Sequence, residues 1–362
     1  MTTQHTILGL MSGSSLDGVD LAIVRYKLNQ DKSILSWHVL DCDTISFQDH
    51  WKNKLAQATD LSGKNLVILD TELGILFGDM IHKFINRNNH EVDLIASHGH
   101  TIFHLPDHKT TCQIGSAAHI LAKNRIPVIS NFRMTDMAYG GQGAPLAPLA
   151  DKYLFPEYDL FLNLGGIANL SITHPGKETA YDICGCNRFF NHYARQFNVE
   201  YDKGGQIAAA GIIREDVIER LKKWSFYVLQ SPKSLDNSEL DVLIHEIDKA
   251  FNYNAKDMLA TYVEHFSIKI AEAFNTTSIE GGEILATGGG AHNIYFCERL
   301  RHYLDARFTL KIPEKKIINF KEAILMTLAG LRSQFNQPIF DQQNTGATQS
   351  STGGAYHSIT IK

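Results

Sequence analysis

The sequence predicts an α/β protein made of two related halves with a ligand-binding cleft between them. A succession of three strands, a helix, a strand and a helix occurs twice along its 362 residues. A glycine-rich turn joins the first two strands of each half, at residues 13–18 and again at 165–166. A chain of this length also suits two domain cores better than one. Ligands of open α/β sheets bind beyond the carboxyl ends of the strands, where we expect these turns to lie.

The first half begins with three closely spaced strands and continues with helices. Apolar runs separated by short turns predict an antiparallel meander of Thr6–Met11, Val19–Tyr26 and Ile34–Cys42. Apolar residues at threes and fours predict helices over 49–58 and 64–87. The other predicted elements of this half are a short buried strand over Val92–Ala96, a polar loop over Ser97–His104, a helix over Ile114–Lys123 and a strand over Ile126–Ser130.

The second half repeats this order after Asn131–Gly143, a glycine-rich and polar segment with the composition of a hinge. Its predicted strands are Phe161–Leu164, Asn169–Thr173, Thr179–Asp182 and Glu283–Ala286. Its predicted helices are Asn187–Phe197, Ile212–Trp224, Leu240–Phe251, Met258–Phe274, Tyr295–Tyr303 and Phe320–Phe335. We therefore expect one lobe over residues 1–132, joined by the polar tail at 336–362, and a second lobe over 133–335.

Composition and charge narrow the choice of partners. The chain is 44% hydrophobic with a net charge of -5, which argues against nucleic-acid or anionic-membrane partners because these favour basic patches. No run approaches the ~20 apolar residues of a membrane span, and the first residues lack the features of a signal peptide. Five cysteines without a framework spacing indicate free thiols in a reducing compartment. We therefore expect a cytoplasmic protein.

The glycine-rich turns are candidates for holding a polyphosphate. Consecutive N–H groups in such turns form an anion-binding nest, and glycine lets the backbone approach a ligand closely. The run Gly288–Gly290 follows a strand and precedes a helix, so it could pack against an adenosine. Each turn alone is also compatible with an ordinary hairpin or a tight strand-to-helix connection, and only their combination indicates ATP. The residues that we expect at the nucleotide are Gly13, Ser14, Ser15, Leu16, Asp17, Gly18, Val19, Asp20, Gly165, Gly166, Asn169, Gly288, Gly289, Gly290 and Asn293.

The first turn also carries two carboxylates, Asp17 and Asp20. A carboxylate beside a phosphate would repel it unless a magnesium ion lay between them. Farther along, Arg133 could clamp a carboxylate or phosphate through two parallel hydrogen bonds, or be a surface residue on a flexible linker.

Three histidines, His98, His100 and His104, have an H-x-H-x-x-x-H spacing that resembles a zinc site. No carboxylate base stands beside them in the sequence, so we expect a polar loop that lines the substrate site rather than a metal site.

Two carboxylates are candidate catalytic groups. Asp182 ends a strand and could act as a general base, although strand-end aspartates commonly cap the next helix. Glu322 opens the final predicted helix, where the helix dipole alone favours a glutamate. The residues by themselves leave these alternatives open.

In these segments the chain resembles the anhydro-N-acetylmuramic acid kinases of the actin-like sugar kinase superfamily. The resemblance spans nearly the whole chain and implies duplicated actin-like ATPase, or ribonuclease H-like, domains. The segments that carry it are Gly9–Asp20, Ser97–Pro106, Gln113–Gly115, Asn131–Pro145, Asn163–Asn169, Tyr181–Asn187, Tyr201–Gly205, Thr287–Asn293, Thr345–Ala347 and Gly353–Ala355.

The resemblance implies that ATP and water convert 1,6-anhydro-N-acetylmuramic acid to N-acetylmuramic acid 6-phosphate, a step of peptidoglycan recycling. It places the catalytic aspartate on Asp182, an assisting glutamate on Glu322 and ATP at residues 13–20. Magnesium bound to ATP would be held by Asp17 or Asp20. The residues that we expect at the sugar are Ser97, His98, Arg133, Gln142, Gly143 and Asn187. A homodimer is a further expectation from the resemblance.

The chain departs from the family's pattern after the catalytic aspartate. Where the family has Asp-Thr-Gly-Pro-Gly-Asn, this chain has Asp182-Ile183-Cys184-Gly185-Cys186-Asn187. His100 also replaces a glutamine, and Gly204 replaces an aspartate or asparagine. The main alternative is an actin-fold kinase of another sugar that cleaves no anhydro bridge. A second alternative is an ATP-switched chaperone or filament protein of the same superfamily, although the chain has no spare length for a chaperone's peptide-binding domain.

Overall fold

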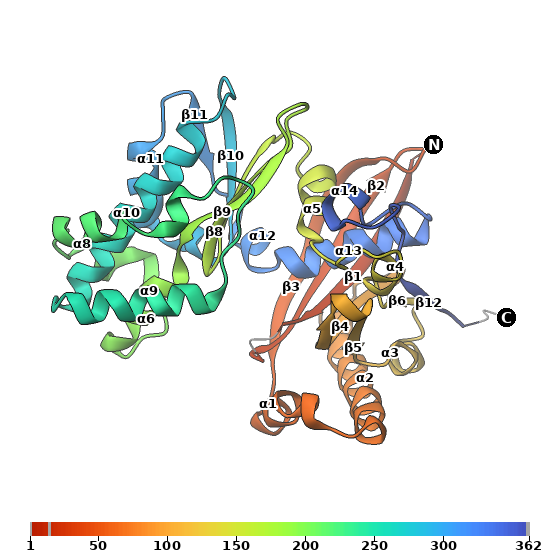
Figure 1. Ribbon diagram of the computed structural model, residues 1–362. Coiled ribbons are helices and arrows are strands. Elements are labelled where there is room, and N and C mark those ends of the chain that lie inside the picture. The colour runs from red at the N-terminus through yellow and green to blue at the C-terminus, as the bar shows by residue number, and fades with distance from the viewer. Residues whose placement is uncertain (1, 14–15, 360–362) are drawn as a thin grey trace. The chain divides into compact units, whose positions relative to one another are not determined.

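The computed structural model describes residues 2–13 and 16–359, which form two compact units (Figure 1). The first unit comprises Met1–Phe155 and Phe320–Lys362, and the second comprises Pro156–Asn319. Each unit combines a β-sheet with helices, so the predicted α/β class is confirmed.

The sheet of the first unit starts with the predicted meander. Its strands β1 (Thr3–Ser12), β2 (Gly18–Leu28) and β3 (Ile34–Ser46) pair antiparallel in chain order. Next to β1 follow, in spatial order, β4 (Leu94–Leu105) and β6 (Val128–Ser130), both parallel, and the antiparallel β12 (Ala355–His357). A further strand, β5 (Thr110–Ile114), pairs with the far half of β4. Because β12 comes from the C-terminal tail, the tail returns to the first unit as expected.

Helix α13 (Lys321–Gln334) packs on this sheet although it is far from it in sequence (Figure 1). Gly9 on β1 lies against the carbonyl of Ala323, where a Cβ would overlap that oxygen. Tyr26 on β2 shares a buried hydrogen bond of 2.7 Å with the hydroxyl of Thr327. The other helices of the unit are α1 (Asp49–Ala56), α2 (Gly63–Arg87), α3 (Ala117–Asn124), α4 (Met134–Ala138), α5 (Ala147–Leu154) and α14 (Gln342–Thr345).

The sheet of the second unit repeats the arrangement of the first. Its meander consists of β7 (Leu160–Leu164), β8 (Ile167–Ile172) and β9 (Thr179–Gly185), and β10 (Gly282–Thr287) and β11 (Phe308–Lys311) continue parallel beside β7. The spatial order β11-β10-β7-β8-β9 corresponds strand for strand to β6-β4-β1-β2-β3 of the first unit. The duplicated topology expected from the sequence is therefore confirmed.

Helix α10 (Ala255–Asn275) runs through the core of the second unit, where most of its residues are buried. The ring of Phe266 packs edge-on against that of Phe189, with centroids 5.1 Å apart. The other helices of this unit are α6 (Asn187–Ala194), α7 (Gln206–Ala209), α8 (Glu215–Leu221), α9 (Asn237–Ala250), α11 (Ile294–Tyr303) and α12 (Lys315–Asn319).

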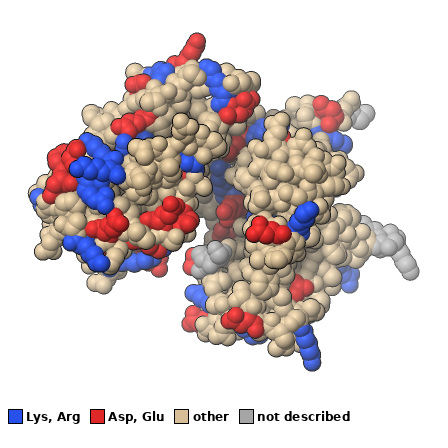
Figure 2. Space-filling view, viewed as in Figure 1, with Lys and Arg blue, Asp and Glu red and all other residues tan. Residues whose placement is uncertain are grey.

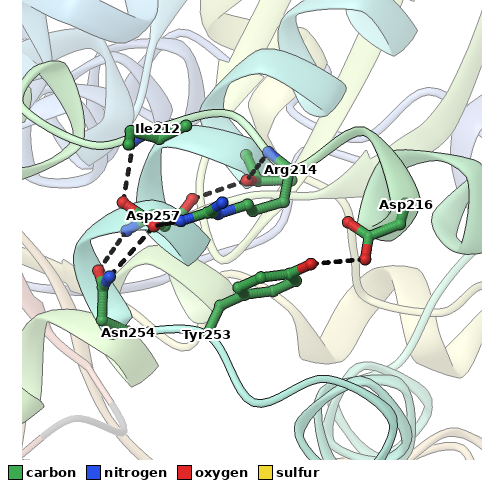
Figure 3. A network of polar contacts seen from close by, with 7 residues as sticks. Ile212, Arg214, Asp216, Tyr253, Asn254 and Asp257 are labelled. Atoms are coloured by element: carbon green, nitrogen blue, oxygen red, sulfur yellow. Dashed lines mark hydrogen bonds and ion pairs between the residues drawn. The ribbon is translucent and has the colours of Figure 1, made fainter.

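A network of polar contacts holds the segment before α8 against α10 (Figure 3). Asp257 is 1% exposed and accepts hydrogen bonds from the amide of Ile212 at 2.9 Å and from Nε of Arg214 at 3.0 Å. The Arg214 guanidinium lies 4.5 Å from the ring centroid of Tyr253, whose hydroxyl donates to Asp216. These contacts keep residues 212–214 outside the helix, so α8 begins at Glu215 rather than at the predicted Ile212.

β4 is longer than predicted, and the whole of the loop expected at Ser97–His104 is strand. Gly99 adopts a φ of +75°, which glycine tolerates, and pairing with β5 continues from His100 to Leu105. The same pairing makes Thr110–Ile114 a strand, so the helix predicted from Ile114 begins only at Ala117. Strand pairing, which local sequence does not reveal, explains both corrections.

The two units divide after Phe155 and after Asn319, whereas the sequence suggested boundaries at 132 and 336. Residues 133–155 and 320–335 thus belong to the first unit. The physical reason is packing on the first sheet, by α13 as described above and by α5, whose Leu154 carbonyl accepts a hydrogen bond of 2.9 Å from Trp37 Nε1.

Charged side chains of both signs are mixed on the face shown in Figure 2, where basic residues form no extended stripe among the atoms that are coloured. Within residues 2–13 and 16–359, no helix is both long enough and apolar enough to span a bilayer.

Candidate active site

The turn between β1 and β2 carries the first group of predicted nucleotide residues. Ser14 and Ser15 lie outside the described residues. On either side of them, Gly13 is half-buried and Leu16 adopts a φ of +60°, with 3.4 Å between its amide nitrogen and the Gly13 carbonyl oxygen. A non-glycine residue rarely adopts this conformation, so the turn is sharply bent at Leu16.

The residues that follow this turn have structural roles in the sheet. A Cβ on Gly18 would overlap the carbonyl oxygen of Ile45, so glycine allows β2 to approach β3. The Val19 side chain is fully buried in the core. These two predicted nucleotide residues could therefore contribute only backbone atoms to a ligand.

Two carboxylates flank the turn in different environments. Asp17 is exposed, whereas Asp20 is half-buried and accepts a hydrogen bond of 2.6 Å from the Thr44 hydroxyl. Burial raises the pKa of Asp20, the Thr44 hydroxyl opposes this rise, and the negative charge of Asp17 adds to it. A cation beside these two residues would relieve that repulsion.

Glu322, in the first turn of α13, belongs to the same electrostatic group. Its side chain is accessible to water, yet the surrounding protein displaces enough solvent to raise the pKa of its carboxyl. The charge of Asp20 raises this pKa further, and the charge of Arg133 lowers it. The first unit therefore brings together Glu322, Asp20 and Arg133, which are far apart in sequence.

Arg133 is half-buried and held in place from two sides. Its Nε donates to Nε2 of His98 at 2.9 Å, and its Nη1 donates to the carbonyl of Gly143 at 2.6 Å. Burial first, and then the charge of Arg133, lower the pKa of His98 to about 4, so the imidazole is neutral and accepts the hydrogen bond. Within the described residues Nη2 of Arg133 makes no hydrogen bond, which leaves that edge of the guanidinium for an anion.

The remaining residues predicted to bind the sugar near Arg133 differ in exposure. Gln142 is exposed, whereas Ser97 is fully buried and its hydroxyl lacks a hydrogen-bond partner in the described part of the chain. His100 shares a hydrogen bond of 2.9 Å between its Nδ1 and the Ser12 hydroxyl. Across residues 2–13 and 16–359, no cluster of His, Cys, Asp or Glu side chains could hold a metal ion by itself.

In the second unit, polar side chains form a row across the sheet. Asn163 on β7 is in register with Thr287 on β10 and with Asn169 on β8, and Asn169 is in register with Asp182 on β9. Register partners on adjacent strands share one face of a sheet. The row brings the predicted catalytic residue Asp182 to the predicted nucleotide residue Asn169. It also adds Asn163 and Thr287, whose signal in the sequence is a polar residue at the end of an apolar strand.

Asp182 is half-buried and held by the segment before α9. The amide of Leu235 donates to its Oδ2 at 2.8 Å, and its own amide donates to the carbonyl of Lys233 at 2.9 Å. In the described part of the chain Oδ1 has no hydrogen-bond partner. Burial raises the pKa of Asp182, and the Leu235 amide opposes that rise. Asp182 does not cap the following helix, because the N-cap residue of α6 is Cys186.

The glycine run after β10 packs against the end of β7. Gly288 has a φ of +84°, and a Cβ there would lie 2.7 Å from the Asn163 side-chain oxygen. A Cβ on Gly290 would lie 2.8 Å from that of Leu164, whereas Gly289 is exposed. Gly288–Gly290 therefore lie beside the turn between β7 and β8, which carries the other predicted nucleotide residues Gly165 and Gly166.

The turn between β7 and β8 also binds the residues at the start of helix α6. The carbonyls of Gly165 and Gly166 accept hydrogen bonds from the amides of Asn187 at 3.0 Å and Cys186 at 2.9 Å. The Asn187 side chain donates to the carbonyl of Leu164 at 2.9 Å. Asn187, a predicted sugar-binding residue, is thus fixed against this turn.

Asn293 has a structural role at the start of α11. Its side-chain oxygen accepts a hydrogen bond of 2.9 Å from the amide of Phe296 and so caps the helix. Gly205 packs directly against this oxygen, and both Gly204 and Gly205 have left-handed φ values, of +69° and +76°. The turn that carries this glycine pair therefore packs against the cap of α11.

Comparison of the sequence with known proteins finds relatives over nearly its whole length. The sequence model of a family described as "Anhydro-N-acetylmuramic acid kinase" matches residues 5–358. Anhydro-N-acetylmuramic acid kinases from Bacillus cereus and Vibrio parahaemolyticus are 30% and 31% identical to the chain. These matches cover 95% and 99% of this chain, and 97% and 100% of the relatives.

A third relative of the same name, from Hydrogenovibrio crunogenus, is 31% identical over 96% of both chains. Coverage this complete leaves no large part of the chain outside the relationship. The chain belongs to the anhydro-N-acetylmuramic acid kinase family.

Proposed function

We propose that the protein opens the anhydro bridge of 1,6-anhydro-N-acetylmuramic acid with water and phosphorylates the freed 6-oxygen with ATP. The products are N-acetylmuramic acid 6-phosphate and ADP, and the reaction serves peptidoglycan recycling. The observation that carries the proposal is the family match over residues 5–358. Burial raises the pKa of both expected catalytic carboxylates, Asp182 and Glu322, which suits groups that handle protons and supports the proposal.

The hydrolytic half of the reaction is assigned to Asp182 as general base. Water attacks the anomeric carbon, its proton passes to the carboxylate, and the electron pair of the bond from this carbon to the 6-oxygen leaves with that oxygen. The hydrogen bond from the Leu235 amide orients the carboxyl and leaves Oδ1 available for the proton, and burial makes it a stronger base than an exposed aspartate. Glu322 would orient the water and the sugar.

The phosphoryl half places ATP at the glycine turns. The 6-oxygen attacks the γ-phosphorus, the bond from this phosphorus to the β–γ bridging oxygen breaks, and ADP leaves. Since the carbonyls of Gly165 and Gly166 already accept the amides of Asn187 and of the N-cap residue Cys186, this turn would offer a phosphate its N–H groups. The exposed Gly289 and its neighbours would face the adenosine.

Magnesium, as the complex with ATP, fits the residues of the first turn. It prefers oxygen ligands and is commonly held by one or two carboxylates together with phosphate oxygens and water. Asp20, oriented by Thr44, and the exposed Asp17 are such carboxylates. When bound, the ion would neutralise charge that develops on the transferred phosphoryl group.

The sugar is assigned to the group around Arg133. The lactyl carboxylate of the sugar is an anion that suits the open edge of the Arg133 guanidinium. The neutral His98 orients this guanidinium by accepting a hydrogen bond from it. The buried hydroxyl of Ser97 and the exposed Gln142 would add polar contacts. A homodimer stays a prediction.

The alternative of a kinase for another sugar rests on the altered segment after Asp182. In the structure Ile183, Cys184 and Cys186 are at most 4% exposed, so their side chains pack in the core. The departure from the family's pattern therefore changes internal packing more than it changes the surface that a ligand can reach.

An isotope experiment separates the two functions. The protein is incubated with ATP, magnesium and the anhydro sugar in water labelled with heavy oxygen, quenched early, and the product is analysed by mass spectrometry. We expect ADP release with the label on the anomeric carbon of the product. Release of ADP without incorporation of label, or faster release with unbridged amino sugars, would establish the alternative.

A further inference from the structure

Hydrogen bonds connect the C-terminal tail to the buried histidine of β4 within the first unit. We propose that Thr345 is a positioning residue for Arg133, acting through Asp136 and Gly143. By this route the tail sets the direction of the guanidinium. The inference rests on the proposed function, in which Arg133 binds the sugar.

The first connection is made by Asp136, whose side chain is fully buried. Its Oδ1 accepts a hydrogen bond of 2.7 Å from the Thr345 hydroxyl, and its Oδ2 accepts one of 2.8 Å from the amide of Gly143. A carboxylate removed from water must be satisfied by hydrogen bonds, and bonds to a charged acceptor are the strong ones. Asp136 therefore ties the tail to residue 143.

The second connection runs from Gly143 to the guanidinium. The carbonyl of Gly143 accepts from Nη1 of Arg133 at 2.6 Å, and Nε of the same side chain donates to His98. Gly143 has a φ of +63°, and a Cβ there would lie 2.8 Å from Cγ of Met137. The amide and the carbonyl of Gly143 flank one Cα in this crowded position, so displacing residue 143 from Asp136 would also displace the carbonyl that holds Arg133.

The tail has other contacts that would survive loss of the Thr345 hydroxyl. The amide of Gln142 donates to the Thr345 carbonyl at 3.0 Å, and the amide of Thr348 donates to the carbonyl of Tyr139 at 2.9 Å. Strand β12 also pairs with β6. The Thr345 hydroxyl also has two long contacts of 3.4 Å within the tail, with the Asp341 carbonyl and the Ala347 amide. Removing the hydroxyl should therefore break its one hydrogen bond to Asp136 while the tail stays docked.

The chain supplies a matched control in Thr348. Its hydroxyl donates to the Tyr139 carbonyl at 3.2 Å, so it too joins the tail to the segment after α4, but it is exposed and does not contact Asp136. Three variants of the full chain test the proposal: Thr345→Val, Thr345→Ser, which keeps a hydroxyl, and Thr348→Val.

Two measurements are made on each variant. Hydrogen exchange monitored by mass spectrometry follows the amides of residues 140–143 without any ligand, and steady-state kinetics give KM for the anhydro sugar and for ATP. We expect Thr345→Val to speed exchange at 140–143 and to raise KM for the sugar about tenfold while KM for ATP stays unchanged. Thr345→Ser should restore both values, and Thr348→Val should resemble the wild type.

Each other outcome counts against the proposal. Unchanged exchange in Thr345→Val would show that its hydroxyl does not hold the turn. Faster exchange with an unchanged KM for the sugar would show that the turn does not position Arg133. Equal losses for sugar and ATP, without rescue by serine, would indicate general destabilisation. Failure of the proposed function is distinguishable, because the wild type would then not turn over the anhydro sugar at all.

Discussion

Asp182 has one carboxylate oxygen without a hydrogen-bond partner among the described residues, while the amide of Leu235 holds the other. We expect Asp182→Asn to lower kcat by about 10²–10⁴-fold, because an amide cannot accept the proton of the attacking water. Single-turnover ADP release measures this, with circular dichroism as the check on folding. The control is Asp241→Asn, which loses only an exposed ion pair with Arg188 and should keep wild-type turnover. Near-normal turnover by Asp182→Asn would contradict the assignment of Asp182 as the general base.

His98 should make stability depend on pH. In the unfolded chain its pKa is near 6.5, whereas burial and then the charge of Arg133 lower it to about 4 in the fold. Between these two pH values the unfolded chain binds more protons, so the free energy of unfolding falls as the pH drops from about 6.5 to about 4, by about 3 kcal/mol in all. Urea unfolding of the wild type and of His98→Gln over this range measures the contribution, since other buried histidines cancel in the difference. Parallel curves for the two proteins would contradict the assignment of a neutral, buried His98.

At the scale of elements, the turn before α7 depends on two glycines that differ in their surroundings. Both have a left-handed φ, so alanine at either position costs about 1 kcal/mol. A Cβ on Gly205 would also overlap the oxygen of Asn293 that caps α11, and loss of a cap costs about 1 kcal/mol more. The atom nearest to a Cβ on Gly204 is 3.9 Å away. In urea unfolding we expect Gly205→Ala to lose about 2 kcal/mol and Gly204→Ala about half as much. Equal losses would show that the cap tolerates the side chain.

At the scale of the whole molecule, the two units differ in how the chain builds them. The second unit is one continuous segment, Pro156–Asn319, with its own sheet and hydrophobic core. The first unit needs α13 and β12 from the end of the chain, and α13 covers the centre of its sheet. We therefore expect residues 156–319 expressed alone to unfold cooperatively on heating, because their core is complete.

The fragment 1–155 is the natural counterpart. It should lack a cooperative transition, because without α13 the sheet face around Gly9 and Tyr26 would be exposed to water. Calorimetry and one-dimensional proton spectra of the two fragments measure both expectations. A fragment 1–155 with dispersed signals and a sharp transition would show that the first core does not need α13.

Local patterns predicted the elements whose burial leaves a mark in a short stretch of sequence. The meander of β1, β2 and β3 was visible as apolar runs separated by short turns, and the central residues of β1 and β2 are continuously buried. Helix α2 was visible because Leu69, Leu73 and Phe77 recur along one side. The extension of β4 beyond Gly99 and the strand β5 were missed because they depend on pairing with each other. The four-residue strand β11 was missed because it is too short to show a period.

The sequence by itself determined the duplicated α/β fold, the family and the candidate site residues Asp182, Glu322 and Arg133. These features could be predicted because glycine-rich turns and strand ends are recognisable in a short stretch of sequence. Only the tertiary structure decided how these residues are held. Strand register placed Asp182 beside Asn169, and the neutral His98 that orients Arg133 comes from a distant strand. Such contacts join residues that are remote along the chain, and they form because the closed core fixes distances that no local pattern specifies.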